Sequence, residues 1–336
     1  MPQTKAKGHV LVAGPCYYPL GQRTGYGGME RLASLVAQEM AVQGWDVDVV
    51  GGARSQQIEG CRVWRGQLEG SFFEAEVAAW QEYGWLRGSN EFVVDFSHSH
   101  LFRMDGFPGV SWIWHDPYLM QPKVPLQGLF ALSKWQAERH FERTHQSIGV
   151  LDPICADPKE FFYDPRVTVG DRWFSLAIFD ANKGQKEAAL LAEEAGICLD
   201  LGGKPVDKTV VDAVKEVEKR TQGRVRYLGE LVGDQKSNLM RSCKGMLYWP
   251  SYPEGYGEAH SHKLVEALMM GVPCVVRDQG AMREVFGMQS GAILTNDSQK
   301  IGLDTRPGAE ISRHATAEWS VQATTQRILD AVKVKA

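Results

Sequence analysis

The 336-residue sequence lacks the patterns that would place it among membrane, secreted or nucleic-acid-binding proteins. It has no apolar run long enough to span a bilayer and no signal-peptide pattern. Acidic residues slightly outnumber lysine and arginine, and a net charge of −4 gives no support for nonspecific binding of nucleic acid or an anionic membrane. We therefore expect a soluble protein of the cytoplasm.

Signatures of several enzyme and metal-site classes are also missing. There is no G-x-S-x-G nucleophile elbow. The dinucleotide fingerprint G-x-G-x-x-G fails because Glu30 follows Gly25 and Gly27 where a third glycine is needed. The six cysteines form no C-x-x-C pair and several lie in apolar runs, which favours buried, reduced thiols. An enzyme that uses NAD through paired Rossmann domains stays an alternative that lacks its usual motif.

Short apolar runs alternate with amphipathic helix patterns along nearly the whole chain. Residues 9–14 predict a strand, residues 28–44 a helix and residues 45–52 the next strand. Such alternation is typical of parallel sheets with helices on both faces. The tail, residues 316–334, predicts one more amphipathic helix.

The length of the chain predicts more than one domain, because single cores rarely grow much beyond about 250–300 residues. The hydrophobic periodicity is lost around residues 161–173, where proline, glycine and charged residues occur, and we interpret this segment as a linker. We predict two Rossmann-like α/β domains, residues 1–165 together with 317–336, and residues 166–316. In such folds ligands bind at the carboxyl ends of the strands, here expected to face the cleft between the domains.

Two strand-to-helix junctions have the features of phosphate sites. In the first, Gly27 and Gly28 stand at the start of a helix, where backbone N–H groups attract anions and glycine permits close approach. In the second, Lys183 and Gly184 follow a strand and open a helix, so the ammonium can meet a phosphate beside the positive end of the helix dipole.

The stretch PSYPEGYGEAHSHKLVEALMMGVPCVV, residues 250–276, repeats this strand–loop–helix–strand arrangement with more chemistry. Glu258 and Glu266 are eight residues apart, so on one helix they would share a face. Carboxylates can accept two hydroxyl groups at once, which is what recognition of a sugar or a ribose requires.

Taken together, these motifs resemble the family-4 retaining glycosyltransferases with the two-domain GT-B fold. Gly27-Gly28-Met29-Glu30 is similar to the glycine-rich start of that family's first helix, and Lys183-Gly184 to its lysine-glycine pair. The stretch PSYPEGYG…EALMMGVPC resembles the third motif, with Cys274 in the place of a valine. The tail resembles the helix that crosses back to the first domain in that fold.

The resemblance implies transfer of a sugar from a nucleotide diphosphate sugar to an acceptor hydroxyl, with retention and without a metal or cofactor. A UDP-hexose is the donor that it favours, while small metabolites, polysaccharides, lipid-linked sugars and modified nucleic-acid bases stay open as acceptors. The implied catalytic residues are His115, Lys183, Glu254 and Glu258. The implied donor-binding residues are Gly27, Gly28, Lys183, Gly229, Glu230, Gly255, Tyr256, Gly257 and Glu266.

By position, Glu266 would hold the ribose, Lys183 the diphosphate, and His115 would face the transferred sugar. Gly27 and Gly28 would close on the diphosphate from the first domain. Chemistry would be front-face substitution at the anomeric carbon, helped by electrostatic stabilisation of the departing diphosphate.

The chain departs from the family pattern at two places. Ala177-Ile178 stands where the family has Gly-Arg, so a second phosphate cation is missing; Lys204, Arg241 or Lys263 could replace it. Otherwise the activity would be reduced, and the alternative from another class is a catalytically silent binder of sugar nucleotides. The family's seven-residue spacing fits Glu258 and Glu266 but not Glu254, so either Glu254 or Glu258 could meet the sugar.

Two further patterns suggest metals, but each has an ordinary explanation. The pairs His98/His100 and His260/His262 lack a regular four-ligand zinc spacing, so we expect no metal site. The D-x-D string at Asp46 lies inside a predicted strand, where strand alternation explains it.

Overall fold

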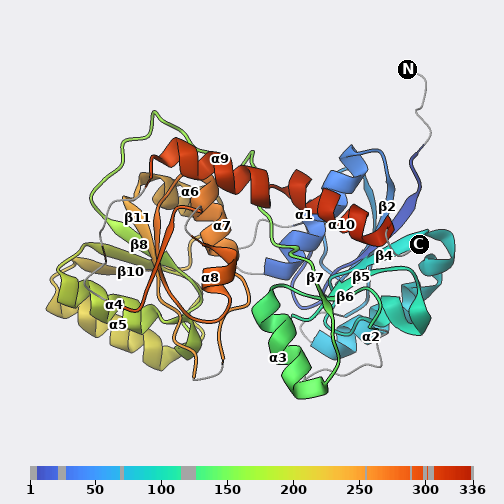
Figure 1. Cartoon of the computed structure of the whole chain (residues 1–336), viewed down its shortest axis with the longest axis horizontal. Coiled ribbons are helices and arrows are strands. Elements are labelled where there is room, and N and C mark those ends of the chain that lie inside the picture. Colours follow the sequence, from blue (N-terminus) through green and yellow to red (C-terminus); the bar gives the residue numbers. More distant parts are fainter. Residues whose placement is uncertain are drawn as a thin grey trace. The chain divides into compact units, whose positions relative to one another are not determined.

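The computed structural model divides into two compact α/β units (Figure 1). It describes residues 6–21, 28–68, 72–114, 126–253, 256–287, 290–297, 301 and 306–333. The first unit comprises the described parts of residues 1–23, 27–155 and 321–336, and the second comprises those of residues 156–320. Each unit is built around one parallel sheet.

The sheet of the first unit has seven parallel strands in the order β3-β2-β1-β4-β5-β6-β7. Its strands are β1 (His9–Ala13), β2 (Asp46–Gly51), β3 (Cys61–Arg65), β4 (Phe92–Asp95), β5 (Gly109–Trp112), β6 (Leu129–Ala131) and β7 (Gly149–Val150). The order reverses direction between β1 and β4, which is the switch point at which open parallel sheets bind ligands.

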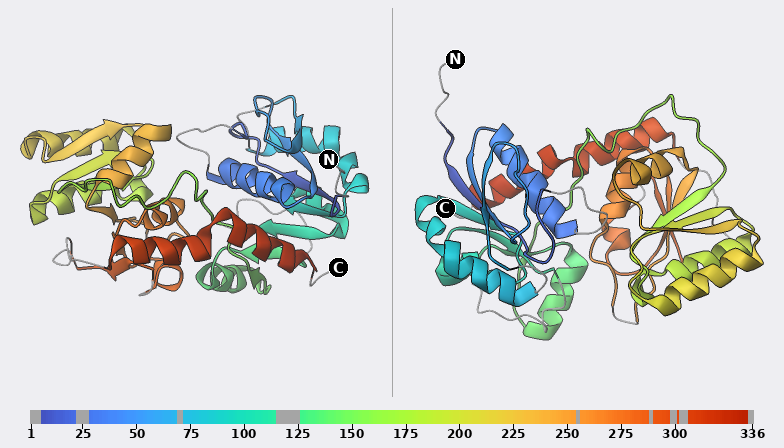
Figure 2. Two further views of the ribbon diagram at one scale, coloured as in Figure 1. Left: turned by 90° about the horizontal axis from the view of Figure 1, so that it is seen from above. Right: turned by 180° about the vertical axis from the view of Figure 1, so that it is seen from behind.

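Helices cover this sheet because their apolar residues recur at helical spacing. The helices of the unit are α1 (Gly28–Val42), α2 (Phe72–Tyr83), α3 (Lys134–Thr144) and α10 (Val321–Lys333), with the 3-10 helices η1 (Gly84–Ser89) and η2 (Leu101–Gly106). In α1, Leu32, Val36 and Met40 are spaced four residues apart and are fully buried. The C-terminal helix α10 packs beside α1 (Figure 2).

The D-x-D string is part of β2, as expected. The Asp48 carboxylate accepts hydrogen bonds from Arg62 Nε at 2.8 Å and from Trp64 Nε1 at 2.8 Å, both on the neighbouring strand β3. Burial alone would raise the pKa of Asp48, but these donors outweigh it and lower the pKa. The carboxylate therefore serves cross-strand pairing.

The second unit holds six parallel strands in the order β10-β9-β8-β11-β12-β13. Its strands are β8 (Trp173–Leu176), β9 (Leu199–Gly202), β10 (Val225–Gly229), β11 (Gly245–Tyr248), β12 (Cys274–Arg277) and β13 (Ala292–Thr295). Its helices are η3 (Ala181–Lys183), α4 (Gln185–Ala195), α5 (Lys208–Arg220), α6 (Gly233–Ser242), α7 (His262–Met269), α8 (Met282–Val285) and α9 (Gly308–Trp319).

Right-handed crossovers distribute these helices over both faces of the second sheet. The chain moves outward from β8 to β10 and then returns to continue from β11 in the other direction, so α4 and α5 share one face, and α6 and α7 the other (Figure 1). The carboxyl ends of β8 and β11 are central to the sheet, and the loops that leave them carry Lys183 and Glu258.

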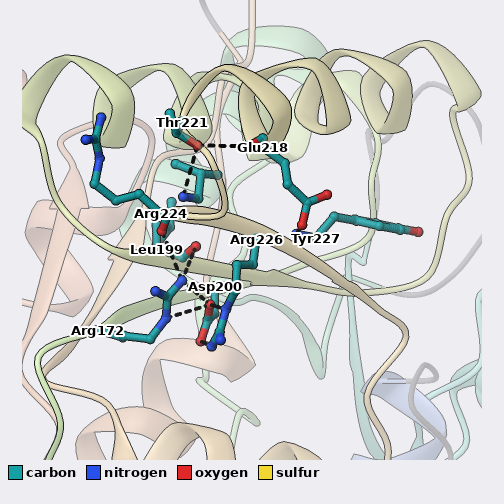
Figure 3. Close-up of polar contacts among 9 residues, drawn as sticks. Arg172, Leu199, Asp200, Glu218, Thr221, Arg224, Arg226 and Tyr227 are labelled. Atoms are coloured by element: carbon teal, nitrogen blue, oxygen red, sulfur yellow. Dashed lines mark hydrogen bonds and ion pairs between the residues drawn. The ribbon is translucent and has the colours of Figure 1, made fainter.

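At the opposite end of this sheet, one buried carboxylate joins the starts of three strands (Figure 3). Asp200 accepts from Arg172 Nε at 2.9 Å and from Arg226 Nε at 2.7 Å and Nη2 at 2.6 Å. Arg172 also donates to the backbone oxygens of Leu199 and Arg224. These contacts hold the amino ends of β8, β9 and β10 together.

The structure confirms the prediction of two Rossmann-like α/β units but not the single helix predicted for residues 316–334. Helix α9 ends at Trp319 and α10 begins at Val321. Between them Ser320 is extended, with ψ 151°, and forms a parallel bridge to Ala156, whose N–H donates to the Trp319 oxygen at 3.0 Å. Pairing with a distant segment interrupts the helix.

Candidate functional site

The loop after β8 places a lysine against the end of β11 in the second unit. Lys183 ends the short helix η3, and Asp180 caps it by accepting the N–H of Asn182 at 2.9 Å. Gly184 follows with φ 69°, and a Cβ there would lie 1.6 Å from the Trp249 oxygen. Only glycine fits this close approach, so the sequence Lys183-Gly184 fixes the lysine beside the segment that follows β11.

Lys183 is the centre of a three-residue polar cluster. Its Nζ lies 2.5 Å from Glu258 Oε1 and donates to the Tyr252 hydroxyl at 2.7 Å. That hydroxyl in turn donates to the same Glu258 oxygen at 2.7 Å. The lysine also lies over the Tyr252 ring, 5.4 Å from its centroid. We call Lys183, Tyr252 and Glu258 the lysine triad.

The electrostatics of the lysine triad keep its cation charged and its phenol neutral. Burial disfavours the charged form of Lys183, but the negative charge and hydrogen bond of Glu258, together with Tyr248 and Tyr252, outweigh it, so the lysine pKa is raised well above its usual value. Burial, with Glu258 close by, raises the pKa of Tyr252. The side chains of Lys183 and Glu258 are 29% and 11% exposed, so both can be reached from solvent.

A second layer of contacts holds the loop that carries Glu258. The Gln279 amide donates to the Tyr252 oxygen at 2.8 Å, and its oxygen accepts the Tyr252 N–H at 3.2 Å. The Ala281 N–H donates to the Glu258 oxygen at 2.9 Å. A Cβ on Gly257 would lie 2.5 Å from the Gly280 Cα, so the two backbones approach closely. These contacts pin the loop against the segment after β12.

Glu266 forms a separate, more deeply buried ionic cluster on α7. Lys236 of α6 brings its Nζ to 2.6 Å from Glu266 Oε2, with side chains only 8% and 4% exposed. Lys263, one turn earlier on α7 and 30% exposed, reaches the same oxygen at 3.4 Å. Helix α7 begins at His262. Glu258 therefore lies in the preceding loop and does not share a helix face with Glu266.

The remaining predicted residues fall into two groups. Outside the described residues lie Gly27, His115, Glu254 and Gly255. Of the others, Gly28 opens α1 in the first unit and is exposed, and Gly229 ends β10 with φ 71°. Glu230 and Tyr256 are exposed at the surface of the second unit.

The structure separates the three candidates for the missing phosphate cation. The Arg241 guanidinium donates to the Glu160 oxygen at 3.0 Å and lies over the Phe162 ring at 4.7 Å, so it braces the segment after β7. Lys263 contacts Glu266, whereas the Lys204 backbone oxygen accepts the Phe179 N–H at 2.9 Å. Of the three candidates for the phosphate cation, Lys263 is therefore one that lies beside a predicted donor-binding residue, Glu266.

The histidine pairs have structural partners. His98 Nδ1 lies 2.9 Å from Glu76 Oε1, and burial lowers the pKa of His100 to about 3. The His260 ring packs edge-on against Phe286 and accepts the Ser261 N–H at 2.8 Å. In the described part of the chain no group of three or more histidine, cysteine or acidic residues could hold a metal ion.

Sequence reasoning missed two members of these clusters, Tyr252 and Lys236. Tyr252 lies inside the PSYPEGYG motif, but its contacts with Lys183 cross 69 positions of sequence. Lys236 left a weak signal, because it lies one turn before the fully buried Met240 and so on the inner face of α6. A lysine on a buried face requires a partner.

A pocket of about 450 Å³ opens in the second unit beside the loop that follows β11 and carries Tyr252 and Glu258. Its lining residues are Leu191, Trp249, Arg277, Asp278, Gln279 and Asn296. Gln279 therefore faces this pocket while its amide holds the backbone of Tyr252.

No helix among the described segments has the length and apolar character to cross a membrane.

Solved structures similar to this chain include GT-B glycosyltransferases, which are likewise built from two parallel-sheet units. AviGT4, a glycosyltransferase involved in avilamycin A biosynthesis, is 20% identical over 98% of each chain, with a TM-score of 0.75. HepE of Anabaena, solved with UDP and glucose, is 14% identical over 97% of this chain and 100% of its own, with a TM-score of 0.69. WaaG, a glycosyltransferase involved in lipopolysaccharide biosynthesis, is 14% identical over 96% of this chain and 95% of its own, at 0.61. The chain therefore has the GT-B fold.

A family model supports the same class within the second unit. Residues 185–302 match the model described as glycosyl transferases group 1. This range contains Glu258, Glu266 and Lys236, while Lys183 and Gly184 precede it directly. No curated protein matches the chain by sequence.

Proposed function

We propose that the protein is a glycosyltransferase that moves a sugar from a nucleotide diphosphate sugar, in particular a UDP-hexose, to an acceptor hydroxyl with retention of configuration. The lysine triad at the carboxyl ends of β8 and β11 carries the proposal, because it combines a charged ammonium and a carboxylate within 2.5 Å. The match of residues 185–302 to the group 1 model supports the reaction class. The structure of HepE with UDP and glucose supports the choice of donor.

In this proposal Lys183 binds the diphosphate of the donor. Its raised pKa means that it carries a full positive charge at neutral pH. A positioned cation stabilises the charge that develops on the departing diphosphate and acts most strongly where water is partly excluded. Substitution would occur on the face of the anomeric carbon from which the diphosphate leaves, so configuration is retained.

Glu258 and Glu266 would recognise hydroxyl groups. Glu258 is the acidic partner of Lys183, so a phosphate that takes over the lysine leaves its carboxylate available to hydroxyls of the transferred sugar. Glu266, on the next helix, would accept the ribose hydroxyls. We assign the sugar contact to Glu258 rather than Glu254 because the lysine triad contains it. His115, Gly27 and Gly28 keep their predicted roles in the first unit, and we propose that no metal or cofactor takes part.

The first experiment is a thermal-shift and hydrolysis screen of the full chain with UDP-, GDP-, ADP- and CDP-sugars and with NAD. A ligand at one hundred times its dissociation constant should stabilise the native protein by about 2.7 kcal/mol, which is a clear rise in melting temperature. Slow release of free nucleotide should accompany binding of the true donor. We expect Lys183→Met to lower kcat/KM by about 10²–10³-fold, because one positioned transition-state contact is lost.

Lys208→Met provides the matched control, since Lys208 is an 87% exposed lysine on α5 and its loss should leave turnover unchanged. Binding of a sugar nucleotide without turnover, even with acceptors supplied, would instead indicate a catalytically silent binder. A response to NAD alone would refute the glycosyltransferase proposal.

A further inference from the structure

Lys236 and Glu266 form a salt bridge that is nearly inaccessible to solvent. The Nζ–Oε2 distance is 2.6 Å, and the two side chains are 8% and 4% exposed. The ammonium also lies 5.1 Å from the centroid of the Phe161 ring, which is itself fully buried. Lys236 therefore connects α6, α7 and the segment that follows β7, and its position is determined from three sides.

Stability alone is a poor reason for such a pair. Desolvating two charges costs several kcal/mol per ion, and replacing buried pairs by apolar side chains of similar size is often neutral or stabilising. A buried carboxylate without a partner is worse still, because the charged form is strongly disfavoured. If Glu266 must be charged and correctly placed before a ligand arrives, a buried lysine at its side meets that need.

We propose that Lys236 is the positioning residue that holds Glu266 ionised and oriented to accept the ribose hydroxyls of the donor nucleotide. The inference rests on the proposed function, in which Glu266 binds the ribose. Lys236 does not touch the nucleotide in this scheme. It acts through the Glu266 carboxylate, and its removal should weaken recognition of ribose rather than recognition of base or phosphate.

Lys263 contacts the same carboxylate oxygen but serves as a contrast. Its Nζ lies 3.4 Å from Glu266 Oε2, and its side chain is 30% exposed. Exposed pairs three residues apart on a helix contribute little, because water already solvates the lysine. The 2.6 Å contact from α6 is therefore the one expected to orient the carboxylate.

The test compares nucleoside diphosphates that have ribose hydroxyls with those that lack them. Calorimetric titration would use UDP, GDP, ADP and CDP and their 2′,3′-dideoxy counterparts against the full chain. One hydrogen bond to a charged acceptor contributes about 1.5–3 kcal/mol, so a single ribose hydroxyl bonded to Glu266 should already make the wild type prefer the ribonucleotide by at least about tenfold. In Lys236→Met this preference should fall below about threefold, while the affinity for the dideoxynucleotide changes little.

A double-mutant cycle separates positioning from general loss of stability. Glu266→Gln should lower the ribose preference as Lys236→Met does, and the double variant should lower it no further, because one residue acts through the other. Lys263→Met should change the preference by less than about threefold. If Lys236→Met does not fold, Lys236→Gln keeps a hydrogen-bond donor at this position and should still lose at least about fivefold of the preference.

The possible failures are distinct. If no nucleoside diphosphate binds the wild type, the proposed function falls and this inference with it. If the wild type binds nucleotides but does not prefer ribose, the role of Glu266 is wrong, while nucleotide-dependent transfer can stand. If the wild type prefers ribose and Lys236→Met or Lys236→Gln keeps the full preference, Lys236 is only a structural residue.

Discussion

Replacement of Asp200 by asparagine tests how the second unit is held together at the end of the sheet away from the lysine triad. Asp200 is 1% exposed and lies between Arg172 and Arg226, as Figure 3 shows. Four donor contacts reach its carboxylate, at 2.5–2.9 Å. Asparagine keeps the shape of the side chain but removes the charge and turns one acceptor into a donor that faces a guanidinium.

The expected loss of stability follows from these contacts. Breaking a fully buried ion pair costs roughly 3–5 kcal/mol, because a charge is left without its partner. Arg172 and Arg226 are 22% and 44% exposed, so water compensates part of their charge. The asparagine oxygen also keeps some of the hydrogen bonds. We therefore expect Asp200→Asn to lower the free energy of unfolding by about 2–3 kcal/mol at pH 7.

The difference in stability between wild type and Asp200→Asn should decrease as the pH falls. Burial would raise the pKa of Asp200, but the hydrogen bonds from Arg226 and Arg172 outweigh it and lower the pKa below its usual value. A depressed native pKa means that the stabilisation is present above the ordinary carboxyl pKa and is lost as pH falls through the native value. The difference between wild type and variant should therefore be largest at neutral pH and should shrink below about pH 4.

Urea denaturation followed by tryptophan fluorescence provides the measurement, since Trp173 begins β8 next to Arg172 and is 3% exposed. Asp212→Asn is the matched control, because Asp212 forms an exposed pair with Lys208 on α5 and should not shift the urea midpoint. Equal stability of Asp200→Asn and wild type at pH 7 would refute the reasoning. A gap that stays constant into acid would refute the electrostatic cause.

Two further predictions follow from single groups in the structure. Tyr252→Phe removes the hydroxyl that lies 2.7 Å from both Lys183 Nζ and Glu258 Oε1 but keeps the ring beneath the lysine. We therefore expect kcat/KM to fall about tenfold with little change in the urea midpoint. An unchanged kcat/KM would show that the hydroxyl does not order the lysine triad. Burial raises the pKa values of Cys61 and Cys243 to about 12, and only Cys198 is partly exposed, so a thiol reagent at pH 8 should modify at most one cysteine in the native protein and all six after unfolding.

The sequence was sufficient to predict the fold and the position of Lys183 and Glu266 along it. Parallel strands bring their carboxyl ends to one edge, so polar residues that directly follow β8 and β11 have to meet there. The spacing of apolar residues that predicts helices α1 and α7 is a local feature, so it can be recognised without knowing which distant segments they contact. Local patterns therefore predicted which segments carry the residues of the candidate site.

Long-range pairings were not predictable in the same way. Tyr252 takes its position from Gln279, which lies 27 residues further along the chain. Lys236 pairs with a glutamate on a different helix. The break at Ser320 depends on Ala156 and is invisible in an amphipathic pattern that continues on both sides. In each case the deciding contact joins segments that no sequence periodicity connects.

The lysine triad also suggests how the proposed donor would be recognised as one molecule. Without a ligand, Lys183 and Glu258 neutralise each other at 2.5 Å. A diphosphate that binds Lys183 removes the charged partner of Glu258 and leaves a carboxylate that is only 11% exposed with the Tyr252 hydroxyl as its donor within the lysine triad, which is costly unless another donor replaces the lysine. Hydroxyl groups of an attached sugar are such donors, whereas a free nucleotide offers none at that position. Under the proposed function, the pairing would therefore couple phosphate binding to sugar binding and would favour the intact nucleotide sugar over its nucleotide product.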